Sequence, residues 1–85
     1  MVDLEVLQAL VRAGEGGLLV GDIQQRIDIP ASTLTHHLKF LKSADLIQQA
    51  KDGRAIINRA NYSHLKELAS FILEECCVDE EPRNV

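Results

Sequence analysis

Side chains that can contact nucleic acid gather in one short stretch of this 85-residue chain, between residues 31 and 43. Its hydroxyl, imidazole and ammonium groups can hydrogen-bond to base edges and to phosphates. The stretch contains no carboxylate, which would repel a phosphate. His37 lies at the edge of the leucine face of this stretch. This position favours a histidine that packs or binds phosphate over one that binds a metal. The residues predicted to contact DNA here are Ser32, Thr33, Thr35, His36, His37 and Lys39.

A second chemical feature is the pair Cys76-Cys77, which are the chain's two cysteines. Soft thiolates select thiophilic species such as arsenite, antimonite or mercury, and thiols can also be oxidised. Neighbouring residues of an intact helix point about 100° apart, so the two thiols would meet at a frayed helix end. The residues alone leave three hypotheses open: a metalloid site, a redox site, or a Cys76 that packs as a small hydrophobic side chain.

The elements that position these groups follow from apolar spacing and from chain breakers. Helical periodicity predicts helices over Asp3–Ala13, from Gly21 or Asp22 to Ile27, and from Ala31 or Ser32 to Ser43. Glycines 14, 16 and 17 end the first helix, and Asp28-Ile29-Pro30 separates the second from the third. Leu34, Leu38 and Leu41 fall on one face of the third helix, which leaves its polar groups on the other.

The second half of the chain predicts a hairpin and a last helix. Strands are expected over Leu46–Lys51 and Arg54–Arg59, joined by a type I′ turn at Asp52-Gly53, and Lys51 and Arg54 at its tip are further predicted DNA contacts. A last helix begins near Asn61 to Ser63, with an apolar stripe that includes Cys76. The fold class is mainly α with a small β-hairpin, a winged helix-turn-helix. Residues 1–77 form the DNA-binding and dimerisation domain, and residues 78–85 form a polar tail that we expect to be disordered.

Charge and composition narrow the function. The net charge of −4 divides into +3 between Gln24 and Arg59 and −7 in the flanks, so a basic centre lies within an acidic frame. There is no apolar run of membrane length and no secretory signal, which predicts a cytoplasmic protein whose thiols stay reduced, without a membrane partner. No phosphate-binding loop, dinucleotide fingerprint or nucleophile–base pattern is present, so we do not expect an enzyme. The alternative to a DNA-binding regulator is a winged-helix module for protein–protein interaction or dimerisation, without specific DNA binding.

Three segments resemble the ArsR/SmtB family of bacterial winged helix-turn-helix transcriptional repressors. They are Pro30–Leu41 with its Ser/Thr-x-His-His-Leu pattern, Ala44-Asp45-Leu46-Ile47 where the family usually has Ala-Gly-Leu-Val, and Asp52-Gly53-Arg54 in the wing. The resemblance implies a homodimeric repressor that binds an operator inverted repeat in double-stranded DNA and is released by an inducer. It also implies a dimer formed by the terminal helices. The further helix that family members usually carry is not found before Leu4, so we expect the dimer to depend mainly on the last helix.

The resemblance also suggests where an inducer would bind. The Cys-Val-Cys motif of one family site has no counterpart in residues 21–28, and of a zinc motif on the last helix only His64 remains, with Glu75 as a weak substitute. Zinc is therefore not expected. Some members sense arsenite with paired cysteines near the end of the last helix, which makes Cys76 and Cys77 the candidate site for a thiophilic metalloid or an oxidant.

Overall fold

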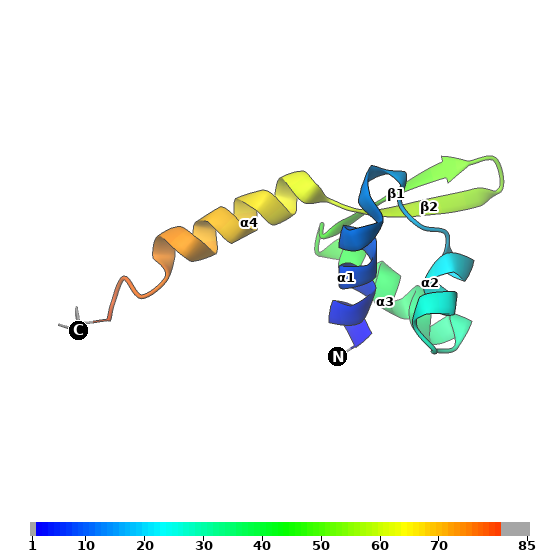
Figure 1. The fold of residues 1–85 in the computed structure, drawn as a ribbon, viewed down its shortest axis with the longest axis horizontal. Coiled ribbons are helices and arrows are strands. Elements are labelled where there is room, and N and C mark those ends of the chain that lie inside the picture. The colour runs from blue at the N-terminus through cyan, green and yellow to red at the C-terminus, as the bar shows by residue number, and fades with distance from the viewer. Residues whose placement is uncertain (1, 81–85) are drawn as a thin grey trace.

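A computed structural model describes residues 2–80 and shows four α-helices, a short 3-10 turn and one β-hairpin. The first three helices pack together, the hairpin lies beside them, and the last helix extends away (Figure 1). This arrangement confirms the predicted winged helix-turn-helix. The elements are α1 (Val2–Ala13), η1 (Gly14–Gly16), α2 (Val20–Arg26), α3 (Ala31–Ser43), β1 (Ile47–Asp52), β2 (Ala55–Ala60) and α4 (Tyr62–Glu75).

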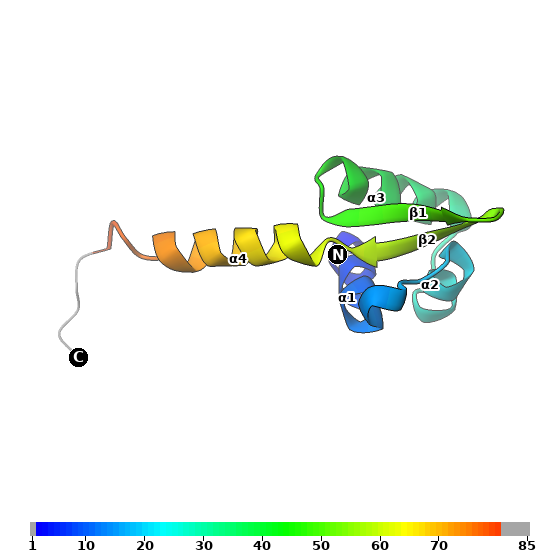
Figure 2. The ribbon, with the colours of Figure 1, turned by 90° about the horizontal axis from the view of Figure 1, so that it is seen from above.

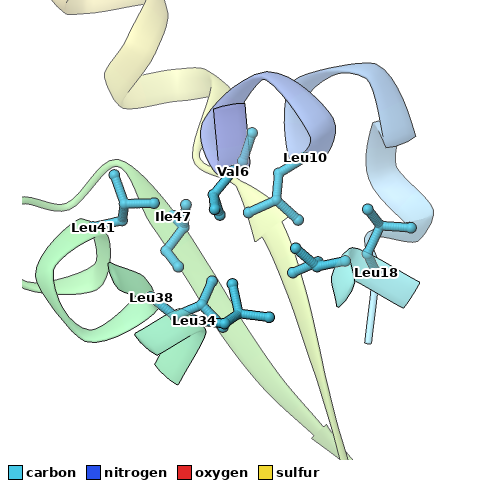
Figure 3. Close-up of a cluster of buried hydrophobic side chains, with 9 residues drawn as sticks. Val6, Leu10, Leu18, Leu34, Leu38, Leu41 and Ile47 are labelled. Carbon is cyan, nitrogen blue, oxygen red and sulfur yellow. The ribbon is translucent and has the colours of Figure 1, made fainter. Parts of the chain in front are cut away.

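The core is small and joins the three helices to the base of the hairpin (Figure 3). Side chains spaced three or four residues apart come from single faces of α1 and α3, and those of α3 are the leucines that the apolar spacing predicted. The core residues are Val6, Leu10, Leu18, Ile23, Leu34, Leu38, Leu41, Ile47 and Ala60. Burial of α3 on this core fixes which of its faces remains in solvent.

The hairpin is antiparallel, with Ile47 opposite Ala60 and Asp52 opposite Ala55. The predicted turn was therefore misplaced by one residue, because the two residues outside the ladder are Gly53 and Arg54 rather than Asp52 and Gly53. The predicted type I′ turn is also wrong, since it needs positive φ at both central residues, and of these two only Gly53 has it, at +64°. The register buries Ile47 and Ala60, and this burial decides the position of the turn.

The segment between α1 and α2 is pinned to the hairpin by a short β-bridge. Leu18 N donates to Asn58 O at 2.7 Å, and Asn58 N donates to Leu18 O at 2.8 Å. Gly17 permits this approach, because its φ is +67° and an added Cβ would lie 2.5 Å from the carbonyl oxygen of Asn58. The bridge thus places the start of α2 beside the β1–β2 hairpin, which is the wing of this fold.

The last helix begins as predicted but packs differently from the other three. The side chain of Asn61 caps it by accepting a hydrogen bond from the backbone N–H of His64 at 3.3 Å. No residue of α4 is buried, and the helix projects from the domain in both views (Figures 1 and 2). Residues 76–80 form turns and a bend, whereas residues 81–85 of the predicted tail lie outside the described part of the chain.

Candidate nucleic-acid interface

The polar face of α3 is exposed, as the sequence predicted. With the leucine face on the core, the side chains on the opposite face lie in solvent, and α3 carries no carboxylate. The first turn adds backbone N–H groups that have no partner within the helix, and such groups bind phosphate readily. The exposed residues of this predicted set are Ser32, Thr33, Thr35, His36 and Lys39.

His37 lies apart from this exposed set. It is half-buried, and its Nδ1 is hydrogen-bonded to Oδ1 of Asp3 in the first turn of α1. Its ring also meets the ring of His36 edge-on, with centroids 6.2 Å apart. The structure therefore places His37 at the packing contact between α3 and α1. This partner is 34 residues away in the sequence, beyond the reach of local patterns.

The wing lies beside α3 and presents its two predicted cations. Lys51, at the end of β1, and Arg54, in the turn, are both exposed. Between the wing and α3 lies a groove that contains Thr35 and Lys39 of the predicted set. The remaining groove residues are Val20, Leu38, Lys42, Gln49 and Ile56.

Two polar residues of this groove were missed by the sequence prediction. Lys42 is exposed and follows Lys39 by three residues, so helical spacing could have placed both on neighbouring positions of one face. Gln49 donates through Nε2 to Oδ1 of buried Asn58 at 2.7 Å, and Asn58 Nδ2 donates to Leu18 O at 3.3 Å. The groove is thus tied to the bridge that positions α2, a connection that local sequence patterns do not contain.

The two cysteines directly follow the end of α4, which extends away from α3 and the hairpin (Figure 1). The helix ends at Glu75, Cys76 is extended, and Cys77 has a positive φ of +62°. This change of backbone direction brings the two Sγ atoms within 3.3 Å, so the thiols do meet at a helix end. Both residues are exposed, which does not agree with a packed Cys76 within a single protomer.

The electrostatic surroundings of Cys77 favour its protonated form. Its hydrogen bond with Cys76, followed by one with Glu80, raises the pKa of the Cys77 thiol above its usual value. Across residues 2–80, no three histidine, cysteine or acidic side chains cluster closely enough to hold a metal ion. One protomer therefore offers a soft ion two adjacent thiols at this place.

The sequence and the fold both match known proteins. A family described as a helix-turn-helix domain matches residues 1–50. A homologue of the cadmium resistance transcriptional regulatory protein CadC, from Staphylococcus aureus, is 32% identical over 66 residues, covering 78% of this chain and 54% of the relative. The transcriptional repressor SdpR of Bacillus subtilis (strain 168) is 29% identical over 58 residues, covering 68% of this chain and 64% of the repressor. The chain thus spans between about half and two thirds of the length of these relatives.

A solved structure with low sequence identity to this chain has the same fold. An ArsR family transcriptional regulator superposes with a TM-score of 0.67 over 92% of this chain and 77% of its own, at 19% identity. Within residues 2–80, no helix has the length and apolar character that a membrane span requires.

Proposed function

Because the chain belongs to the helix-turn-helix domain family, we propose that it is a DNA-binding transcriptional repressor of the ArsR type that acts as a homodimer. The resemblance to ArsR-type regulators is confirmed by the relatives and the fold. The expectation that the chain is not an enzyme agrees with relatives that are transcriptional regulators. We place the protein in the cytoplasm, where its operator and a reducing environment for its thiols are found.

One observation carries the DNA-binding proposal: the exposed face of α3 has no carboxylate and lies beside a wing with cations at its tip. A helix fits the major groove of B-DNA, which is about 12 Å wide. Thr35 and His36 would contact base edges, while Lys39, Lys51 and Arg54 would contact phosphates. Ser32 and Thr33, in the first turn of α3, would bind a phosphate of the DNA backbone near the N-terminus of the helix. His37 would act by holding α3 against α1.

We propose a second copy of the chain as the partner of α4. Leu68, Phe71, Ile72 and Leu73 are between 41% and 76% exposed, which is a large apolar surface for one helix. The exposed side of α1 adds an apolar groove that contains Leu4 and Val11. A C2 dimer would cover both surfaces, because each protomer would offer the same patch to the other. The α3 helices of the two protomers would then act as the recognition helices and face the two halves of an inverted repeat.

The thiol pair is the proposed inducer site. Two Sγ atoms 3.3 Å apart could displace two hydroxyls of arsenite, forming two As–S bonds and releasing two waters. A peroxide could instead accept two electrons from the thiols, giving a disulfide and reduced oxygen as water or alcohol. A metalloid is the first candidate, because a soft ion needs only the proximity of the sulfurs. Titration calorimetry with arsenite, zinc and hydrogen peroxide, repeated on Cys76→Ser/Cys77→Ser, separates these inducers.

The proposal is tested by selecting duplexes from a random-sequence library and measuring their binding in gel-shift assays at low salt. We expect a retarded complex at or below micromolar protein and selected sequences that form an imperfect inverted repeat. Thr35→Ala, His36→Ala and Arg54→Ala should each weaken binding while the fold is retained. If no duplex is retarded, the exposed apolar face of α4 would instead favour the alternative function, a module for protein association.

A further inference from the structure

The last helix joins the rest of the domain at its first turn. The hydroxyl of Tyr62 donates to the backbone oxygens of Val11 at 2.9 Å and Leu10 at 3.3 Å, and Leu65 packs partly against the core. Beyond this turn the side chains are exposed and the ribbon leaves the domain (Figure 2). A helix held in this way takes its direction from the contacts of its first turn and of the residue before it, which we call the root of α4.

Asn61 connects this root to the end of α3. Its Oδ1 caps α4, while its Nδ2 donates to the backbone oxygen of Asp45 at 3.0 Å and to Oδ1 of Asp45 at 3.3 Å. Its backbone N–H donates to Leu46 O at 3.0 Å, and only 7% of the residue is exposed. One amide side chain therefore fixes where α4 begins and holds that point on the segment that follows the recognition helix.

Asp45 holds its side of the contact in an unfavourable backbone conformation. Its φ is +63°, a left-handed conformation that glycine adopts more easily than aspartate. The carboxylate gains contacts that glycine could not make, because Oδ1 accepts from Asn61 and Oδ2 lies 3.9 Å from Nδ1 of His64 in the first turn of α4. A glycine at this position would lose both contacts.

We propose that Asn61 and Asp45 are positioning residues that set the angle between α3 and α4, and through it the separation of the two recognition helices in the dimer. This inference rests on the proposed function, in which α4 carries the dimer. The helix has 14 residues, so its length is about 21 Å, and a rotation of about 10° at the root moves its far end by about 4 Å. That displacement is close to the rise of one base pair, about 3.4 Å. The angle would thus determine which half-site spacing the dimer prefers.

The test uses variants that change the root without removing the cap. Asn61→Asp keeps an oxygen for the N–H of His64 but removes the donor to Asp45 and adds a second carboxylate beside it. Asp45→Gly removes the carboxylate, keeps the backbone acceptor and adopts a positive φ at little cost. Ser63→Ala is the matched control, because it changes an exposed residue in the same turn of α4.

The first measurement requires no DNA. A spin label on Lys39→Cys, in a Cys76→Ser/Cys77→Ser background, reports the distance between the two recognition helices of the dimer by double electron–electron resonance. We expect one narrow distance distribution for the parent and for Ser63→Ala. Asn61→Asp should shift or broaden it by about 4 Å or more, the displacement expected for the lever arm. Asp45→Gly should change it in the same way but less.

The second measurement uses the selected inverted repeat with its central spacer shortened or lengthened by one or two base pairs. We expect the parent to prefer one spacing by at least tenfold and Asn61→Asp to lose or move this preference, with dimerisation and single half-site affinity unchanged. A folded, dimeric variant with the parent's distances and spacing profile overturns the proposal for the residue replaced. Unfolding of Asn61→Asp would assign Asn61 to folding rather than positioning, and would overturn the proposal for it.

The two measurements also separate this inference from the proposed function. A parent protein that dimerises but selects no duplex contradicts DNA binding, while the label distances still test the positioning role. A parent protein that remains monomeric contradicts both the proposed dimer and the inference.

Discussion

Individual side chains divide into those that contact solvent on the polar face of α3 and those that hold the helix in place. Thr35, His36 and Lys39 are exposed, whereas neighbouring His37 pairs with Asp3. Residue type alone does not separate these roles, because both histidines are adjacent and chemically identical. Their different positions on the helix decide which one can contact a ligand.

Removal of a base contact should weaken binding without affecting stability. We expect Thr35→Ala and His36→Ala to lower the affinity for the selected duplex by about tenfold each, the typical cost of removing one base contact. Both side chains are exposed, so the midpoint of urea unfolding should stay within error of the parent. Fluorescence anisotropy and circular dichroism measure the two quantities, with Ser63→Ala as the control. A fall in stability that parallels the fall in affinity would argue against a contact role.

The reactivity of Cys77 should depend on its neighbour. Its pKa is raised first by the hydrogen bond with Cys76, so less thiolate is present at neutral pH than in a free cysteine. We expect slow alkylation of Cys77 by iodoacetamide at pH 7, with a rate that rises as the pH approaches the raised pKa. Cys76→Ala removes the main cause and should speed alkylation at pH 8. Rates that are equal in the parent and in this variant would contradict the assigned cause.

At the scale of elements, the bridge between Leu18 and Asn58 joins the helix-turn-helix to the wing. Gly17→Ala would place a methyl group 2.5 Å from Asn58 O at a φ of +67°, so we expect it to lower the free energy of unfolding by about 2 kcal/mol. Gly16→Ala is the matched control, because no atom lies within 4 Å of its added Cβ. Urea denaturation checks both, and equal losses of stability would show that the close approach is not needed.

The sequence predicted the helices well because their signals are local. Leucines at spacings of three and four residues mark α3, Pro30 precedes it, and Asn61 caps α4. The hairpin turn was misplaced because Asp-Gly is a strong turn signal, whereas the register follows burial of Ile47 and Ala60. The contact between the thiols depends on the end of α4 at Glu75, where no glycine or proline marks a boundary. The pairing of Asp3 with His37 could not be predicted, because it depends on the packing of two helices that are far apart in the sequence.

At the scale of the whole molecule, a small helical domain and hairpin carry one extended helix with an apolar surface. In a single protomer α4 contributes no buried residue, so a charge on that surface should leave the domain folded. We expect Ile72→Glu to convert a dimer into a folded monomer, because the charge would be buried in the interface. Sedimentation velocity measures the change, and Ser70→Glu adds the same charge at an exposed position away from the apolar stripe. An unchanged dimer in the Ile72 variant would place the interface elsewhere.

The acidic total charge does not oppose DNA binding, because charge is segregated along the chain. The net −4 combines a basic middle segment, which forms α3 and the wing, with acidic flanks that contribute to α1 and α4. We expect the acidic terminal helices to lie away from the DNA in the proposed dimer. The local field at α3 and the wing therefore matters more for binding than the total charge.

The salt dependence of duplex binding tests most directly whether α3 and the wing bind DNA. Anisotropy titrations of the selected duplex between 50 and 200 mM salt should give an affinity that falls steeply, since each phosphate contact adds about 0.9 to the slope of log affinity against log salt. Lys39→Ala and Arg54→Ala should each reduce the slope by about one for every phosphate that the variant no longer binds, while Lys66→Ala on α4 leaves it unchanged. No binding at micromolar protein in low salt, or a slope that changes as much with Lys66→Ala as with Lys39→Ala, would contradict DNA binding by this face.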